Sequence, residues 1–285
     1  MPPIFEVLST GVGLSIQDRG RSGWRRFGVP VGGAMDGYSM DAANELLGNQ
    51  SGVPVLEILM QGAKLRVLQD TWIALAGADL GCVVEPWTAR EVKADSIIAF
   101  PSNRSGLFAY LAVPGGFVAE QWFGSASVDA RNGLGRQIKK GDTLSAVTST
   151  PNLSLDRVAR RIFSVEQQRG FGAKQTFELL RGPQFDLFSE GALSCLIDSV
   201  WTVSARSDRT GFRLEGPQVD VPESLPSEPV LPGSFQIPGN GQPIVTMVDG
   251  PTVGGYAKPA ILQEADVDRL AQCAPGTQIS FRWLD

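Results

Sequence analysis

The stretch GNGQPIVTMVDGPTVGGY, residues 239–256, surrounds a short apolar strand with glycines, prolines and an acid. Adjacent glycines let the backbone adopt positive φ or approach another group closely, which an ordinary turn does not require. Asp249 stands at the end of the strand and offers a charge, and Tyr256 offers a hydroxyl on a rigid ring. A related set of residues, 17–21 and 28–36, lies near the N-terminus. We interpret 239–256 as a strand followed by a loop that carries functional groups.

Short strands bounded by turn residues continue along the whole chain. They are rich in β-branched and aromatic side chains, and the 33 glycines and 19 prolines suit many turns. The sequence predicts strands over 4–8, 55–60, 64–68, 72–76, 96–100, 107–113, 176–180, 200–203, 234–237, 244–248 and 278–283. The fold class is therefore mostly β.

Three short helices interrupt this pattern. Asp36 is placed to cap a helix over 37–47, and Ser189 is placed to cap a second helix that ends at 197. A third helix is predicted over 265–272. Few helices among many strands favour barrels or sandwiches over a doubly wound parallel sheet.

The 285 residues allow two medium domains, and strand signals thin out between 145 and 174. We therefore expect an N-terminal domain over 1–150 and a C-terminal domain over 151–285, with the boundary inside 145–174.

The composition excludes several classes of function. A net charge of -5 argues against a nucleic-acid partner, and no apolar run has the length of a membrane span. The N-terminus lacks the pattern of a signal peptide. Three widely spaced cysteines argue against a disulfide framework and favour a reducing, cytoplasmic location.

The chain has no histidine. Ser-His-Asp and Cys-His mechanisms, histidine bases and histidine-rich metal sites are therefore excluded, and we expect no metal. Any catalysis must use carboxylates, lysine, arginine, tyrosine, hydroxyls or backbone dipoles.

The loop after the 244–248 strand holds the richest group of candidate residues. A carboxylate near a lysine or a tyrosine can move a proton at an amide nitrogen or a carbonyl, and consecutive glycine amides can bind an oxyanion. The alternative is a tight hairpin whose tyrosine caps the core. The candidates are Asp249, Thr252, Gly254, Gly255, Tyr256 and Lys258.

Two further charged groups are candidates for binding a substrate. Asp18 and Arg21 flank a Gly-Pro loop, where they either meet a polar substrate or hold the loop itself. Asp208, Arg209 and Arg213 alternate in charge. Arginine binds a carboxylate or carbamate in bidentate fashion, although an ion-pair network at a barrel rim is the alternative.

These motifs resemble a known family over nearly the whole chain. The matching stretches are 17–21, 28–36, 46–49, 76–79, 109–116, 207–214, 236–238 and 249–256. The family comprises the C-type subunits of ATP-dependent 5-oxoprolinase, and it is also described as allophanate hydrolase subunit 2 or the biotin-dependent carboxyltransferase-like family. The resemblance implies two cyclophilin-like β-barrels.

The resemblance also implies an activity. Such a chain would work with subunit-A-like and subunit-B-like proteins to convert 5-oxo-L-proline, a lactam, to L-glutamate with ATP. Arg21, Arg209 and Arg213 would hold the carboxylate or an acyl phosphate. Asp249, with Tyr256 or Lys258, would handle protons. Activity of the chain alone is not expected, and the chain has no phosphate-binding glycine loop that would place ATP on it.

Two other functions remain open. One is a non-catalytic regulator that binds a subunit-B-like, kinase-inhibitor-like partner. The other is a carboxyltransferase module of the urea carboxylase type. Because this chain has no biotinyl-lysine motif, another protein would supply the carboxybiotin. The family's Arg and Gln are replaced by Gly250 and Pro251, which indicates weaker or altered activity if those side chains touch substrate in relatives.

Overall fold

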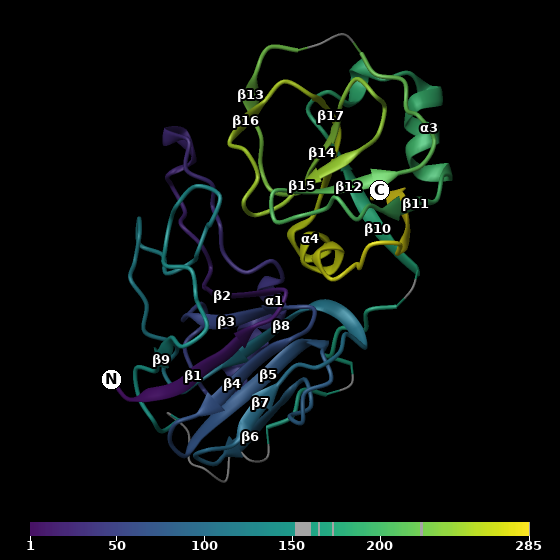
Figure 1. Ribbon diagram of the computed structural model, residues 1–285. Helices are drawn as coiled ribbons and strands as arrows, with labels where there is room; N and C mark the ends of the chain where they lie inside the picture. The colour runs from purple at the N-terminus through teal and green to yellow at the C-terminus, as the bar shows by residue number, and fades with distance from the viewer. Residues whose placement is uncertain (152–160, 165, 173, 223–224, 285) are drawn as a thin grey trace. The chain divides into compact units, whose positions relative to one another are not determined.

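The computed structural model describes residues 1–151, 161–164, 166–172, 174–222 and 225–284. Short β-strands dominate the fold, as Figure 1 shows. The chain forms two compact units. Unit 1 holds residues 1–21 and 32–171, and unit 2 holds residues 22–31 and 172–285. No helix among the described residues is long and apolar enough to cross a membrane.

Unit 1 is built from two antiparallel sheets around one core. A four-stranded sheet has the order β7-β4-β1-β9, and a five-stranded sheet has the order β2-β3-β8-β5-β6. Among the described residues, the strand pairing of unit 1 therefore forms two open sheets, whereas the strands of unit 2 form one closed barrel. The strands are β1 (Pro3–Thr10), β2 (Gly13–Gln17), β3 (Val55–Leu59), β4 (Ala63–Val67), β5 (Thr71–Asp79), β6 (Thr88–Val92), β7 (Ile97–Ala99), β8 (Ser105–Ala112) and β9 (Thr143–Ser145).

Helix α1 (Gly37–Leu46) packs on β5 and β8 of unit 1. Asp36 caps the helix as predicted, since its carboxylate accepts from the Ser39 backbone N–H at 3.0 Å. Gly77 of β5 leaves room for this packing, because a Cβ there would lie 3.3 Å from the Ser39 Cβ of the helix and 2.5 Å from the Phe108 carbonyl oxygen of β8. The apolar face predicted for the helix, including Met40 and Ala43, is buried.

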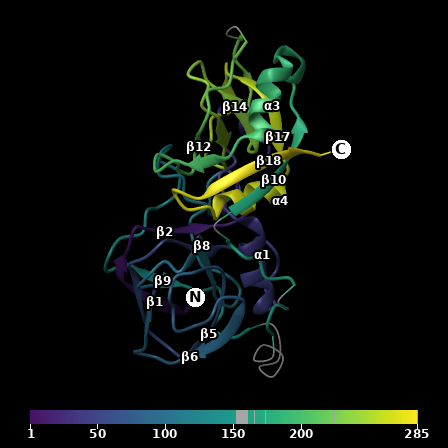
Figure 2. The same cartoon turned by 90° about the vertical axis from the view of Figure 1, so that its right-hand side faces the viewer.

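Unit 2 is a closed seven-stranded barrel of order β10-β17-β14-β15-β12-β11-β18. Figure 2 shows β18 beside β10, to which it pairs in parallel. A small separate sheet joins β13 to β16. The strands are β10 (Lys174–Arg181), β11 (Trp201–Val203), β12 (Gly211–Glu215), β13 (Glu228–Pro229), β14 (Ser234–Ile237), β15 (Ile244–Thr246), β16 (Val253–Gly254), β17 (Ala257–Leu262) and β18 (Gln278–Trp283).

The barrel core is aromatic. The rings of Phe235 and Phe281 meet edge to face with centroids 5.0 Å apart, a favoured aromatic geometry. The fully buried Trp201 donates its indole N–H to the Leu196 carbonyl at 3.0 Å, so this large side chain leaves no polar atom unsatisfied. Leu196 lies on helix α3 (Glu190–Asp198), and the remaining α-helix of the described residues is α4 (Glu264–Ala271).

The predicted strands and helices are confirmed, with ends that shift by a few residues. Ser189 caps α3 as predicted. The prediction missed β2, β6, β9, β12, β13, β16 and β17. Proline usually argues against an interior strand. In β17 it is tolerated where the register with β14 shifts, between the pairs of Phe235 and Ile237. That tertiary irregularity leaves no trace in the local sequence.

Candidate functional site

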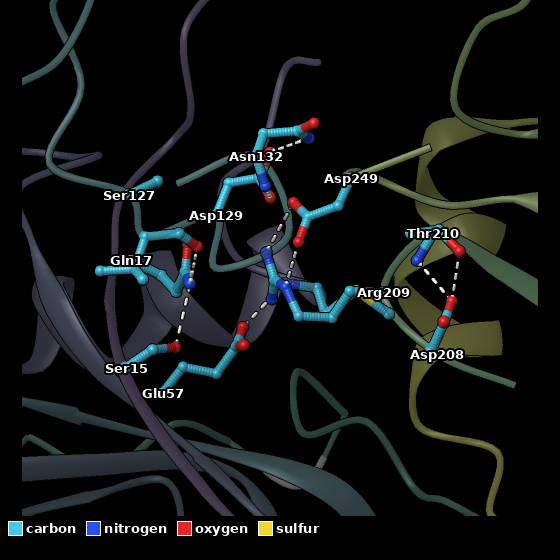
Figure 3. A network of polar contacts seen from close by, with 12 residues as sticks. Ser15, Gln17, Glu57, Ser127, Asp129, Asn132, Asp208, Arg209, Thr210 and Asp249 are labelled. Carbon is cyan, nitrogen blue, oxygen red and sulfur yellow. Dashed lines mark hydrogen bonds and ion pairs between the residues drawn. The ribbon is translucent and has the colours of Figure 1, made fainter. Parts of the chain in front are cut away.

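Asp249 and Arg209 form the central ion pair of unit 2. Arg209 Nε donates to Asp249 Oδ2 at 2.6 Å and Arg209 Nη2 donates to Asp249 Oδ1 at 3.1 Å (Figure 3). The Asp249 backbone N–H also donates to the Arg209 carbonyl at 3.0 Å. The carboxylate is 7% exposed. This planar, two-bond arrangement is the strong geometry of an arginine–carboxylate pair.

The other two charges of the 208–213 segment lie elsewhere. The exposed Asp208 accepts from the Thr210 backbone N–H at 2.8 Å, which tightens the turn that carries Arg209. In Figure 3 the Arg209 side chain extends toward Asp249, whereas Asp208 turns back to Thr210. Arg213 is exposed on β12, where its backbone N–H donates to Ser207 Oγ at 3.0 Å. The structure thus joins Asp249 to one of the three predicted residues.

Lys258 is buried on β17 and is ion-paired with Glu228 of β13. Gln184 bridges the pair, since its Oε1 accepts from the Lys258 backbone N–H at 3.0 Å and its Nε2 donates to Glu228 Oε1 at 2.7 Å. The hydrogen bond from Lys258 is the largest cause that lowers the pKa of Glu228. Lys258 therefore has its own acid, and among the described residues it does not pair with Asp249.

Tyr256 is half exposed, and within the described part of the chain its hydroxyl makes no hydrogen bond. The loop between Asp249 and Lys258 therefore presents this hydroxyl to solvent. Thr252 is partly buried, and its carbonyl accepts from the Val230 backbone N–H at 3.0 Å. The Thr252 backbone thus helps hold the small β13–β16 sheet in place.

The two adjacent glycines do not form the expected oxyanion nest. Gly254 lies in β16 opposite Glu228, and neither Gly254 nor Gly255 has positive φ. Such a nest needs alternating backbone conformations that turn successive N–H groups to one side. A Cβ at Gly254 would make a tight contact with the end of the Gln236 side chain, 3.2 Å from its Oε1.

Gly250 is required by packing. A Cβ at this position would lie 2.3 Å from Thr246 Cγ2 and 2.8 Å from two carbonyl oxygens. The next residue, Pro251, accepts a hydrogen bond through its carbonyl from Arg25 Nη2 at 3.3 Å. Sequence reasoning missed Arg25, which is separated from Pro251 by 226 positions. Its place between the quoted stretches 17–21 and 28–36 was the available signal.

In unit 1, the Asp18 carboxylate accepts hydrogen bonds from four donors. It accepts from the Gly20 and Ala126 backbone N–H groups at 2.7 Å each, and from Ser125 and Ser127 Oγ at 2.6 Å each. Three of these donors reach Oδ1 and one reaches Oδ2, so both oxygens of the carboxylate are held by the protein. This geometry corresponds to the structural alternative for Asp18, because the residue ties the 125–127 loop to the end of β2.

Arg21 is 1% exposed and donates from Nη2 to the Ser127 carbonyl. Gly32 makes room for it, because a Cβ at Gly32 would lie 2.7 Å from Arg21 Nη1. Arg21 and Asp18 therefore hold the same serine-containing loop from two sides. Within unit 1 the structure brings these two predicted residues together.

A buried acid supports the entry to α1. Glu57 Oε2 accepts from the Met35 backbone N–H at 2.8 Å and from the Tyr110 hydroxyl at 2.9 Å. The Tyr110 oxygen in turn accepts from the Asp36 backbone N–H at 2.8 Å. Burial, with the nearby charges of Glu57 and Asp36, raises the pKa of Tyr110 well above its ordinary value. These contacts fix the loop that leads into the helix.

Gln17 is a second residue that the prediction missed. It is fully buried, and its Nε2 donates to Ser15 Oγ at 2.9 Å (Figure 3) and to the Val128 carbonyl at 3.0 Å. Its Oε1 is a buried acceptor with no donor in the described chain. Strand alternation, which puts Gln17 on the face opposite Ile16, was the available signal.

Two of the three cysteines lack the properties of nucleophiles. Burial raises the pKa of Cys273 to about 12 and also raises the pKa of Cys82. Both are therefore thiols at neutral pH, and the thiolate is the reactive form. No group of three or more cysteine or acidic side chains in the described residues is placed to hold a metal ion.

The sequence comparisons give a family and a full-length relative. Residues 27–283 match the family model of the carboxyltransferase domain, subdomain A and B. The chain is 33% identical to the C-type subunit of 5-oxoprolinase from Escherichia coli, over 98% of this chain and 90% of that protein.

Solved structures show the same fold. The crystal structure of TTHA0988 matches with a TM-score of 0.88 and 33% identity over 98% of this chain, which spans 56% of that protein. The Kluyveromyces lactis urea amidolyase matches with a TM-score of 0.91 and 29% identity over 100% of this chain, which spans 19% of that enzyme. The chain therefore covers about half of the first structure and a fifth of the second.

Proposed function

The chain belongs to the carboxyltransferase domain family, subdomains A and B, and from this premise we propose that it is the C-type subunit of an ATP-dependent 5-oxoprolinase. The observation that carries the proposal is the match to the E. coli protein, which extends over nearly all of both chains. Subunit-A-like and subunit-B-like partners would complete a cytoplasmic complex that opens 5-oxo-L-proline to L-glutamate. The chain has no glycine-rich phosphate loop, so ATP would bind on a partner.

The contacts of unit 2 suit the chemistry of a lactam. Hydrolysis adds water to the ring carbonyl carbon, breaks the carbon–nitrogen bond and places a proton on the departing nitrogen. Asp249, oriented by Arg209, would accept a hydrogen bond from the lactam N–H. The half-exposed Tyr256 hydroxyl would deliver the proton to the nitrogen. Lys258, paired with Glu228, would act as a positioning residue for this loop.

Reconstitution tests this function. The chain would be co-expressed with its subunit-A-like and subunit-B-like partners, and L-glutamate would be measured from 5-oxo-L-proline with and without ATP. We expect ATP-dependent glutamate only when all three proteins are present, and co-elution of this chain with the subunit-B-like protein. Equal turnover by the two partners without this chain, or separate elution at micromolar concentration, would contradict the proposal.

The match to the urea amidolyase favours a second candidate, a carboxyltransferase module. The carboxyl group would arrive on biotin carried by another protein, and the Asp249–Arg209 pair would orient an amide acceptor. Decarboxylation of carboxybiotin, stimulated by an amide and dependent on this chain, would support this candidate. Absence of that stimulation together with ATP-dependent glutamate formation would exclude it.

A further inference from the structure

Arg25 has an unusual position in unit 2. It begins the short 3-10 helix η1 (Arg25–Phe27) of the segment 22–31, here called the arm, which belongs to the same compact unit as the barrel. Arg25 Nη2 donates to the Pro251 carbonyl at 3.3 Å, so the guanidinium lies against the turn that follows Asp249. The arm therefore adds a cation to the candidate site.

The second terminal nitrogen of Arg25 has no such acceptor. Nη1 is buried and makes no hydrogen bond to any described residue, and no carboxylate of the described residues forms an ion pair with Arg25. Burial alone lowers the pKa of Arg25 from its ordinary value. A buried donor without an acceptor costs free energy, and the cost is greater for a charged group. A bound anion would remove that cost.

Within unit 2, the neighbouring charges do not compensate the cation of Arg25. Asp249 is the acid of this loop, but both of its carboxylate oxygens already accept from Arg209. The unsatisfied Nη1 donor of Arg25 is therefore the group that an anion of a ligand would meet.

We propose that Arg25 binds the carboxylate of the substrate, through Nη1, beside the Asp249–Pro251 turn. One free terminal nitrogen suits one carboxylate oxygen, whereas a phosphate group is usually held by several donors. The proposal rests on the proposed function and narrows its substrate to an amide or lactam that also carries an acid. Arg25 is then a specificity-determining residue that selects such a substrate over an uncharged amide such as urea.

Its neighbour provides a matched control. Arg26 lies on the same 3-10 helix, but it is exposed and its guanidinium lies over the Phe27 ring, 4.8 Å from the centroid. The substitutions Arg25→Gln and Arg26→Gln remove the same charge from adjacent positions. Only the first removes a buried donor beside Pro251.

The test compares 5-oxo-L-proline with its uncharged carboxamide in the reconstituted complex. Arg25→Gln should lower kcat/KM for the acid by about 10- to 100-fold, which is the range of one hydrogen bond to a charged group. The same substitution should change kcat/KM for the carboxamide by less than about twofold. Arg26→Gln should change neither. Arg25→Lys should recover part of the loss, since it keeps the charge.

Thermal unfolding separates this role from a structural one. Because the substitution removes the buried Nη1 donor, which has no acceptor among the described residues, Arg25→Gln should keep or raise the Tm in the absence of ligand. A lowered Tm with equal losses for the acid and the carboxamide would overturn the proposal. So would a wild-type complex that turns over both compounds equally well.

Equilibrium binding separates the failure of this inference from the failure of the proposed function. If the complex shows no turnover, calorimetric titration of the isolated chain with 5-oxo-L-proline still reports on Arg25. Binding of the acid but not the carboxamide, lost in Arg25→Gln, would support the site. Equal binding by wild type and variant, or competition by inorganic phosphate in place of the acid, would overturn the carboxylate assignment.

Discussion

At the scale of single residues, most predicted charges have a partner inside the protein. The Asp18 carboxylate accepts from four donors, and Lys258 is paired with Glu228. Asp249 is 7% exposed, and both of its carboxylate oxygens accept from Arg209, which lies 40 positions earlier in the chain. The chemistry of the candidate site therefore depends on this pair.

Substitution of Asp249 tests the pair. Asp249→Ala should abolish ATP-dependent ring opening and lower the free energy of unfolding by about 1–3 kcal/mol, because Arg209 loses two charge-assisted hydrogen bonds. A double-mutant cycle with Arg209→Ala should show coupling of about 1–2 kcal/mol. Asp208→Asn is the control. It removes a neighbouring charge but keeps Oδ1, the atom that accepts from the Thr210 backbone N–H. Near-normal turnover by Asp249→Ala would make Asp249 a structural residue.

The Glu228–Lys258 pair predicts a dependence of stability on pH. The pKa of Glu228 lies below its ordinary value of 4.5 in the folded protein, so the carboxylate stabilises the fold above that pH. This contribution is lost as the pH falls through the lowered pKa. Glu228→Gln should therefore have a lower Tm than wild type at pH 7, and the difference in Tm should shrink as the pH falls through the lowered pKa of Glu228. A constant difference in Tm across this range would contradict the assignment.

At the scale of elements, the turn after β15 depends on the absence of a side chain. A Cβ at Gly250 would lie less than 3 Å from the Thr246 side chain and from two carbonyl oxygens. A Cβ at Gly239 would have no atom within 4 Å. Neither glycine has positive φ. The two positions therefore differ in packing, not in backbone conformation.

Alanine substitutions at these two glycines should therefore have different effects on stability. Gly250→Ala should destabilise the protein by about 1–3 kcal/mol, as overpacking does. Gly239→Ala, the matched control, should change the free energy of unfolding by less than about 0.5 kcal/mol. Urea unfolding of both variants provides the measurement. Equal effects would show that the turn can relax around a side chain at 250.

At the scale of the whole molecule, the chain visits unit 2 twice. Residues 22–31 belong to that unit, although residues 1–21 and 32–171 belong to unit 1. Part of the predicted boundary region, 152–160, lies outside the described residues. We propose two domains joined within 145–174, with the arm as an N-terminal contribution to the C-terminal domain.

Limited proteolysis tests this arrangement. Cleavage within 145–174 should leave two resistant fragments. They should stay associated under native conditions, because the N-terminal fragment carries the arm. Size-exclusion chromatography before and after denaturant gives the measurement. Rapid separation of the fragments without denaturant would show that the arm contributes little to unit 2.

The sequence by itself determined the fold class, the main strands and helices and the family. Periodicity, turn residues and caps are local signals. Asp36 and Ser189, for example, each cap a helix by accepting from the backbone N–H three residues later. Only the tertiary structure decided which charges meet. Asp249 and Arg209 are 40 positions apart, and Arg25 and Pro251 are 226 apart. Barrel closure and the path of the arm bring such residues together. No local sequence pattern indicates contacts between residues so far apart in the chain.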